Sequence, residues 1–172
     1  MHPIIPGSTL RWTQPSARSS SHELRAGDDL AATLEFRGGR ATAVSASGTW
    51  TIERDVTRTI RVWNVATREL VGELGKGSWS GRRTFLTADG DLLIWEPANL
   101  LHTAWRFRGD CGAALEFRRG RGVIRADGMV DVGDAVTSTA VLELLAILAR
   151  YLVLISDRDN AAASIAGSIP TA

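Results

Sequence analysis

Apolar and polar residues alternate along most of the chain between Thr9 and Val132. In residues 30–37, one set of alternate positions is occupied by Leu30, Ala32, Leu34 and Phe36. Because side chains i and i+2 of a strand point to the same face, such a run places one face in a core and the other in water. Glycine-bearing turns recur about every 8 to 12 residues, as in a sandwich or barrel. The pattern therefore predicts about twelve short strands before Gly133.

A different pattern begins after Gly133. Asp134 is expected to cap a helix, and residues 136–155 are an apolar stretch interrupted by Glu143 and Arg150. A helix that is apolar on nearly all sides is buried in protein or in lipid. We favour protein, because two charges would be costly inside a bilayer. A closed sheet of about twelve strands is also too wide to be filled by its own side chains.

Together these patterns predict a mainly β fold, a closed barrel of about twelve strands around a C-terminal hydrophobic α-helix. Residues 1–7 form a lead-in, and residues 8–156 form a single barrel domain with a central helix at 136–155. Residues 157–172 are expected to be a flexible tail, because they are small and polar. A chain of 172 residues is long enough to bury a core of this kind.

Composition excludes some partners and compartments. The chain is 44% hydrophobic and 23% charged, which is typical of a globular protein, and its net charge of +1 gives no reason to expect nucleic acid. The single cysteine, Cys111, allows neither an intrachain disulfide nor a cysteine-based metal site, and its strand parity predicts burial. Residues 1–6 lack the pattern of a secretory signal, so we expect a cytoplasmic protein, at most peripheral at the membrane.

Two glycine-rich segments resemble catalytic motifs and fail on spacing. Residues 72–78 lack the first glycine and the final Ser or Thr of a phosphate-binding loop, so they are interpreted as a hairpin turn. Residues 77–81 have Trp79 where a nucleophile elbow needs serine. Residues 59–74 resemble one propeller blade hairpin, but a propeller needs several repeats, so a lone hairpin is the better interpretation.

The histidines give no sign of a metal site either. None has a second histidine three or four residues away: they are His2, His22 and His102. His102 is expected in a turn or on a strand surface. We therefore predict no catalytic residue, no metal site, no cofactor and no enzymatic activity.

Tryptophan is the main aromatic feature of the sequence. There are six: Trp12, Trp50, Trp63, Trp79, Trp95 and Trp105. We expect them to pack in the core and at the barrel rim. A ligand-stacking face shared with nearby arginines is the alternative, but alternation predicts that Trp105 and Arg106 point to opposite sides. A single face that contains all of these side chains is therefore not expected.

Two turns concentrate arginine. Residues 29–40 (DLAATLEFRGGR) and 110–121 (DCGAALEFRRGR) are similar in sequence, so equivalent hairpins are expected. The candidate residues for contact with an anionic lipid surface or another ligand are Arg37, Arg40, Arg118, Arg119 and Arg121. Each arginine near anionic lipid contributes on the order of 1 kcal/mol, screened by salt. The alternative is that these are solvated hairpin tips.

Five segments in order give the chain a family resemblance. They are residues 10–16 (LRWTQPS), 22–28 (HELRAGD) leading into 34–36 (LEF), 48–52 (GTWTI), 89–99 (DGDLLIWEPAN) and the Leu-rich segment 142–155. With them, residues 8–156 resemble the tubby C-terminal-like superfamily, which includes LURP-one-related proteins and phospholipid scramblases, and in particular its small bacterial members. The resemblance implies a twelve-stranded barrel with a hydrophobic helix threaded through it.

What the resemblance implies for function is less specific. Some members of the superfamily bind phosphoinositide headgroups, and scramblases are linked to lipid movement and calcium. No lipid-binding residue of the family can be placed on this chain by motif, and the calcium-loop pattern is absent from the sequence.

Three functional classes stay open at this stage. The first is a non-enzymatic barrel that binds a ligand, an anionic membrane surface or a protein partner. The second is a membrane-anchored protein that uses the C-terminal helix. The third is an enzyme with an unrecognised site. The sequence sets neither the ligand nor the oligomeric state.

Overall fold

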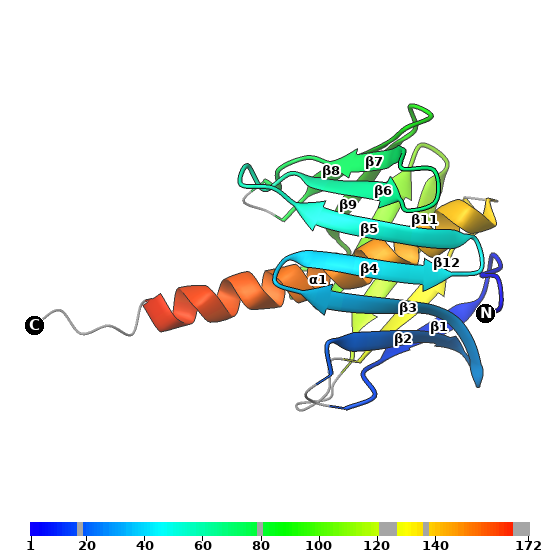
Figure 1. Cartoon of the computed structure of the whole chain (residues 1–172), viewed down its shortest axis with the longest axis horizontal. Coiled ribbons are helices and arrows are strands. Elements are labelled where there is room, and N and C mark those ends of the chain that lie inside the picture. Colours follow the sequence, from blue (N-terminus) through cyan, green and yellow to red (C-terminus); the bar gives the residue numbers. More distant parts are fainter. Residues whose placement is uncertain (17–18, 79–80, 121–126, 136–137, 167–172) are drawn as a thin grey trace, which may run out of the picture.

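The computed structural model describes the chain except for residues 17–18, 79–80, 121–126, 136–137 and 167–172. The described residues form twelve strands and one helix (Figure 1). The strands are β1 (Thr9–Thr13), β2 (Ser21–Ala26), β3 (Asp29–Arg37), β4 (Arg40–Ser45), β5 (Gly48–Arg54), β6 (Ile60–Asn64), β7 (Leu70–Leu74), β8 (Arg83–Thr87), β9 (Leu92–Pro97), β10 (Ala104–Gly109), β11 (Gly112–Arg119) and β12 (Gly128–Val132). The helix is α1 (Thr139–Ala166).

The strands close into a barrel. Each strand pairs antiparallel with its neighbours in sequence, and β1 pairs with β12 to complete the ring. The alternation seen in the sequence produces this wall: in β4, Ala41, Ala43 and Ser45 are buried inside while the residues between them are exposed. The predicted mainly β fold, a closed barrel with a C-terminal hydrophobic helix, is confirmed.

Helix α1 runs through the bore of the barrel (Figure 1). Its side chains from Leu142 to Ile155 are buried, with the exception of the half-buried Leu154. Residues 139–164 are long and apolar enough by length and composition to cross a membrane, but 72% of their most apolar window lies inside this protein. Each buried leucine contributes roughly 1.5–3 kcal/mol. The helix therefore forms the centre of the hydrophobic core.

The bounds of the helix differ from the prediction. It begins at Thr139, so Asp134 precedes it by several residues and does not cap it. It also continues to Ala166, so the predicted end of the helix at residue 155 is wrong and residues 157–166 are helical. The reason is that the preceding buried turns fix the helix geometry, and each further residue adds a backbone hydrogen bond. Whether residues 157–166 are flexible stays a prediction. Residues 167–172 lie outside the described part.

The predicted burial of Cys111 is also wrong. The thiol is exposed, in the turn between β10 and β11. A β-bulge between Phe107 and Arg108 pairs them with Leu115 and Ala113, which leaves Ala114 as an extra residue. Beyond the bulge the inward and outward positions exchange, because the side-chain period of a strand is two.

The two ends of the barrel are different. At one end helix α1 begins, and at the other its C-terminal end emerges beyond the strands (Figure 1). We call the second end the exit mouth. The turns between β3 and β4, β5 and β6, β7 and β8, and β9 and β10 lie there, because successive antiparallel strands alternate in direction.

Candidate ligand-binding site

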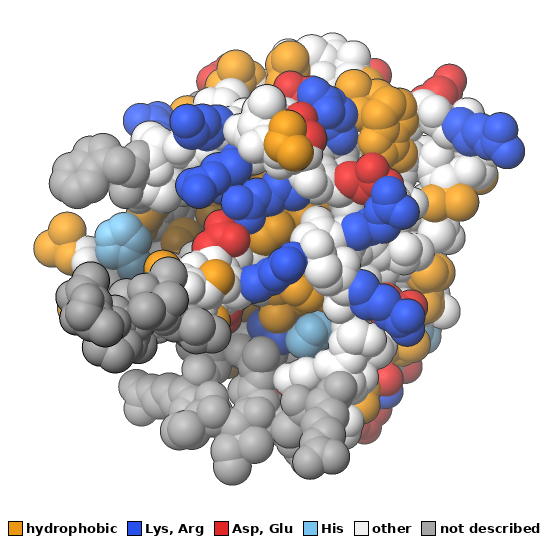
Figure 2. Space-filling model, turned by 60° about the vertical axis from the view of Figure 1, so that its left-hand side comes forward, with side chains coloured by type: hydrophobic (Ala, Val, Ile, Leu, Met, Phe, Trp, Pro, Cys, Tyr) orange, Lys and Arg blue, Asp and Glu red, His pale blue; other side chains and the backbone are white. Residues whose placement is uncertain are grey.

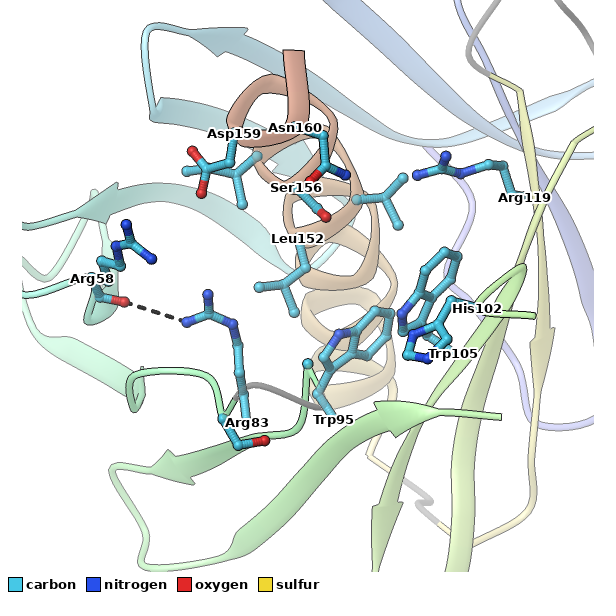
Figure 3. Close-up of a pocket in the computed structure, with 14 residues that line it drawn as sticks. Arg58, Arg83, Trp95, His102, Trp105, Arg119, Leu152, Ser156, Asp159 and Asn160 are labelled. Atoms are coloured by element: carbon cyan, nitrogen blue, oxygen red, sulfur yellow. Dashed lines mark hydrogen bonds between the residues drawn. The ribbon is translucent and has the colours of Figure 1, made fainter. Parts of the chain in front are cut away.

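A cavity of about 490 Å³ opens at the exit mouth between helix α1 and the wall formed by β8 to β11 (Figure 3). This volume is within the range of small-molecule sites. Figure 2, which brings the exit mouth forward, shows Lys and Arg side chains gathered on this face. The cavity is therefore the candidate ligand-binding site.

Three arginines near the exit mouth occupy inward positions of their strands. Each lies two residues from a buried inward side chain: Arg54 follows Ile52, Arg83 precedes Phe85 and Arg119 follows Phe117. Inward positions in a barrel normally carry apolar side chains, because a buried charge loses its hydration. The half-buried Arg54 and Arg83 therefore need compensation from a neighbouring group, whereas Arg119 is exposed.

The emerging end of helix α1 compensates two of the three arginines. Asp159 accepts hydrogen bonds from Nη1 of Arg54 at 2.8 and 3.1 Å. Asp157 accepts one from Nη2 of Arg119 at 2.5 Å, and the Arg119 guanidinium lies 5.5 Å from the centre of the Trp105 ring. These charged hydrogen bonds anchor the helix to the rim.

Arg83 differs from the other two because it makes no ion pair with any carboxylate that the structure describes. Its Nη1 donates to the backbone carbonyl of Gly75, at 3.1 Å. It also donates to the backbone carbonyl of Arg58, at 3.3 Å (Figure 3). Burial, followed by the positive charge of Arg54, lowers the pKa of the Arg83 guanidinium below its usual value. An arginine still keeps its proton, so Arg83 is a partly buried cation held in place by neutral acceptors.

The charge of the described lining is positive. It includes Arg58, Arg83 and Arg119 against one carboxylate, Asp159. Arg58 makes no ion pair with a described carboxylate either, and it takes a positive φ of 68° in the turn between β5 and β6. The arrangement therefore suits an anion.

One side of the cavity is aromatic and apolar. Trp95 on β9 and Trp105 on β10 face inward with ring planes 3° apart and centroids 6.4 Å apart. Trp105 is half-buried, whereas Trp95 is nearly covered. Leu152 of helix α1 lies opposite them (Figure 3). A ligand here would place an apolar part against this wall.

Helix α1 also presents polar groups to the cavity. Ser156 and Asn160 lie one turn apart on the side of the helix that lines it (Figure 3). A hydroxyl and an amide can both donate and accept hydrogen bonds. They can therefore bind neutral polar groups of a ligand.

The five arginines that the sequence singled out do not form one cluster. Arg37 pairs with Glu35 and Arg40 with Glu53 beside the turn between β3 and β4. Arg118 points outward to Glu116 and Asp131, whereas Arg119 points into the exit mouth. Arg121 lies outside the described residues. All four described arginines have carboxylate partners, and their role at a lipid surface stays a prediction.

Most other sequence-based interpretations agree with the structure. Residues 60–74 form the hairpin β6–β7. Of residues 72–78, which were interpreted as a hairpin turn, 72–74 belong to β7 and 75–78 follow that strand. His102 lies in the turn between β9 and β10 with a φ of 52°, and it lines the cavity. Trp105 faces inward while Arg106 pairs with Glu96 outside. Among the described residues no group of three or more His, Cys, Asp or Glu side chains is arranged to hold a metal ion, and the absence of a metal site stays a prediction.

Arg83 was not among the candidate residues that the sequence indicated, and it entered only as one of the arginines near the tryptophans in the alternative of a stacking face. Its parity was informative, because Arg83 lies two residues before Phe85 and so shares its inward position. The candidate residues were chosen from turns, whereas Arg83 is the first residue of β8. Trp95 and Trp105 were expected in the core or at the rim, and a face shared with arginines was not expected.

Comparison with known proteins adds no functional information. No family model matches the chain, and neither a curated protein nor a solved structure matches it.

Proposed function

We propose that this protein is a non-enzymatic binding barrel whose ligand is a small organic anion held in the exit-mouth cavity. The observation that carries the proposal is Arg83, an inward arginine with neutral hydrogen-bond partners in a cavity lined by two further arginines. Its two counterparts on the rim, Arg54 and Arg119, are both compensated by aspartates of helix α1.

The physical reason is the cost of a partly buried charge that makes no ion pair with a described carboxylate and that Asp159 stabilises only through space. A partly desolvated cation is less favourable than a hydrated one, and an anion restores the lost interaction. Charged hydrogen bonds of this kind are roughly twice as strong as neutral ones. The Trp95 and Trp105 wall adds apolar contact, which distinguishes an organic anion from an inorganic one.

The family resemblance remains part of the proposal. We propose membership of the tubby-like superfamily, supported by a twelve-stranded barrel that closes around a C-terminal apolar helix. A membrane-anchoring role for the helix is less well supported, because its apolar residues are buried inside the barrel.

A matched pair of fluorescent probes tests the binding function. The anionic probe 8-anilinonaphthalene-1-sulfonate and its neutral relative N-phenyl-1-naphthylamine differ by one sulfonate group. We expect the anionic probe to bind the wild-type protein and to bind Arg83→Gln at least about tenfold more weakly, since a charged hydrogen bond contributes about 1.5–3 kcal/mol. Binding of the neutral probe should be equal in both proteins.

Arg82→Gln is the control, because Arg82 is the neighbouring residue and its nearest carboxylate is Glu96, at 3.8 Å. It should bind the anionic probe as the wild type does. Circular dichroism and thermal unfolding establish that each variant is folded. Equal affinity of the anionic probe for the wild type and for folded Arg83→Gln would refute the proposed function.

A further inference from the structure

We propose that the ligand of the exit-mouth cavity is a phosphate monoester that carries a flat ring, such as a nucleoside monophosphate. The phosphate would be bound by Arg83 and Arg58, and the ring would lie against the Trp95 and Trp105 wall. This inference rests on the proposed function and specifies its ligand.

The hydrogen bonds of Arg83 leave one edge of its guanidinium available. Nη1 is directed to the carbonyls of Gly75 and Arg58, which fixes the plane of the group. The edge formed by Nε and Nη2 makes no hydrogen bond with another described residue. Two parallel N–H groups on one edge match two oxygens of a phosphate or carboxylate.

Gly77 packs closely against the Arg83 side chain. A Cβ atom at this position would lie 3.2 Å from Nε and 3.3 Å from Cζ of Arg83, which is closer than ordinary contact. The backbone of the β7–β8 connection thus approaches the guanidinium without a side chain in between. A larger residue at position 77 would therefore push the Arg83 side chain out of its present position.

Charge favours a phosphate monoester over a monocarboxylate. The described lining has three arginines and one aspartate, a net of two positive charges. The partners outside the lining, Arg54 and Asp157, cancel each other. A phosphate monoester carries about −1.5 to −2 at neutral pH, whereas a carboxylate carries only one negative charge. The dianion therefore matches the lining.

The remaining surfaces suit a ring with hydroxyl groups. The half-buried Trp105, whose ring is nearly parallel to that of the covered Trp95, is the ring on which a flat ligand can stack. Ser156 and Asn160 face the cavity from the helix and can bond the hydroxyls of a sugar (Figure 3). Phosphate, ring and hydroxyls together define a nucleotide-like ligand.

Calorimetric titration with three probes tests each part of this inference. Adenosine 5′-monophosphate has both parts, ribose 5-phosphate lacks the ring, and adenosine lacks the phosphate. We expect the monophosphate to bind at least tenfold more tightly than either fragment. Arg83→Gln and Gly77→Val should each weaken its binding at least tenfold, and Arg82→Gln should not.

Three results would overturn the ligand assignment. Affinity of the monophosphate no higher than that of adenosine would exclude the phosphate site, and affinity no higher than that of ribose 5-phosphate would exclude the ring site. No detectable binding of the monophosphate also overturns it. In any of these cases, Arg83→Gln can still weaken binding of the anionic naphthalene probe. The proposed binding of an organic anion would then stand, and only the assignment of a phosphate monoester with a ring would be wrong.

Discussion

Arg150, in the middle of helix α1, donates a hydrogen bond from Nη2 to Nδ1 of His22 on β2, over 3.0 Å, and both side chains are buried. An arginine is always a donor, so Nδ1 must be the acceptor and the ring must be neutral. Burial, and then the charge of Arg150, lower the pKa of His22 from 6.5 to about 4. Burial also lowers the pKa of Arg150 to about 10.

This pair predicts acid sensitivity. The unfolded state takes up a proton on His22 near pH 6.5, whereas the folded state does so only near pH 4. The neutral, buried His22 therefore contributes fully to the free energy of unfolding above pH 6.5. This contribution decreases as the pH falls from 6.5 and is lost below about 4, which lowers the free energy of unfolding by roughly 3 kcal/mol. Urea unfolding at several pH values measures the slope. His22→Asn, which keeps an acceptor near Nδ1, should show less loss over this range, and an unchanged slope would contradict the assignment.

A buried carboxylate near the start of the helix gives a second prediction. Glu143 accepts hydrogen bonds from Oγ of Ser45 and, at 2.9 Å, from the backbone N–H of Ser47. Ser45→Ala removes the hydroxyl donor from a fully buried acid, so it should lower the free energy of unfolding by about 1–3 kcal/mol. Ser47→Ala keeps the backbone donor and should change stability by less than about 0.5 kcal/mol. Similar losses in the two variants would argue against this role.

The helix is expected to be necessary for folding. Leu148 is completely buried, so Leu148→Asp would place an unpaired charge in the core and should prevent cooperative folding. Ala162 lies on the exposed end of the same helix, and Ala162→Asp should fold normally. Deletion of residues 136–172 should leave insoluble strands. A soluble deletion variant with a cooperative thermal transition would show that the barrel does not depend on its helix.

The proposed anion site also predicts an effect of Asp159 on helix α1. Asp159 contributes the one carboxylate among the described lining residues. Asp159→Asn removes a like charge and releases Arg54, so the anionic naphthalene probe should bind about fivefold more tightly, which corresponds to about 1 kcal/mol. Asp131→Asn, whose carboxylate pairs with Arg118 at 2.8 Å outside the cavity, is the control. Equal gains in the two variants would point to a general charge effect.

Periodicity was sufficient to predict the barrel and its central helix, because burial alternates along regular strands and an apolar helix needs enclosure. It failed at Cys111, because a single bulged residue, Ala114, exchanges inward and outward positions and leaves no clear mark in the sequence. It failed again beyond Ile155, where local composition suggested fraying but the helix continues as far as Ala166.

The candidate site depends on neighbours that are distant in sequence. The carboxylates that pair with the inward arginines lie on helix α1. Asp159 is more than 100 residues after its partner Arg54, and Asp157 is 38 residues after its partner Arg119. No local pattern shows that Asp159 and Asp157 reach those two arginines while Arg83 is left with backbone carbonyls. Strand parity alone could have identified Arg83 as inward. It could not have shown that Arg83 makes no ion pair with a described carboxylate.

The central claim is tested most directly by locating a bound anion in a crystal. 4-Bromophenylphosphonate combines an anionic group with a ring whose bromine is visible by anomalous scattering. We expect the phosphonate oxygens within hydrogen-bonding distance of the Nε and Nη2 atoms of Arg83, with the bromine beside Trp105. Occupied density at outer-surface arginines such as Arg118, with the exit-mouth cavity empty at saturating ligand, would contradict the account.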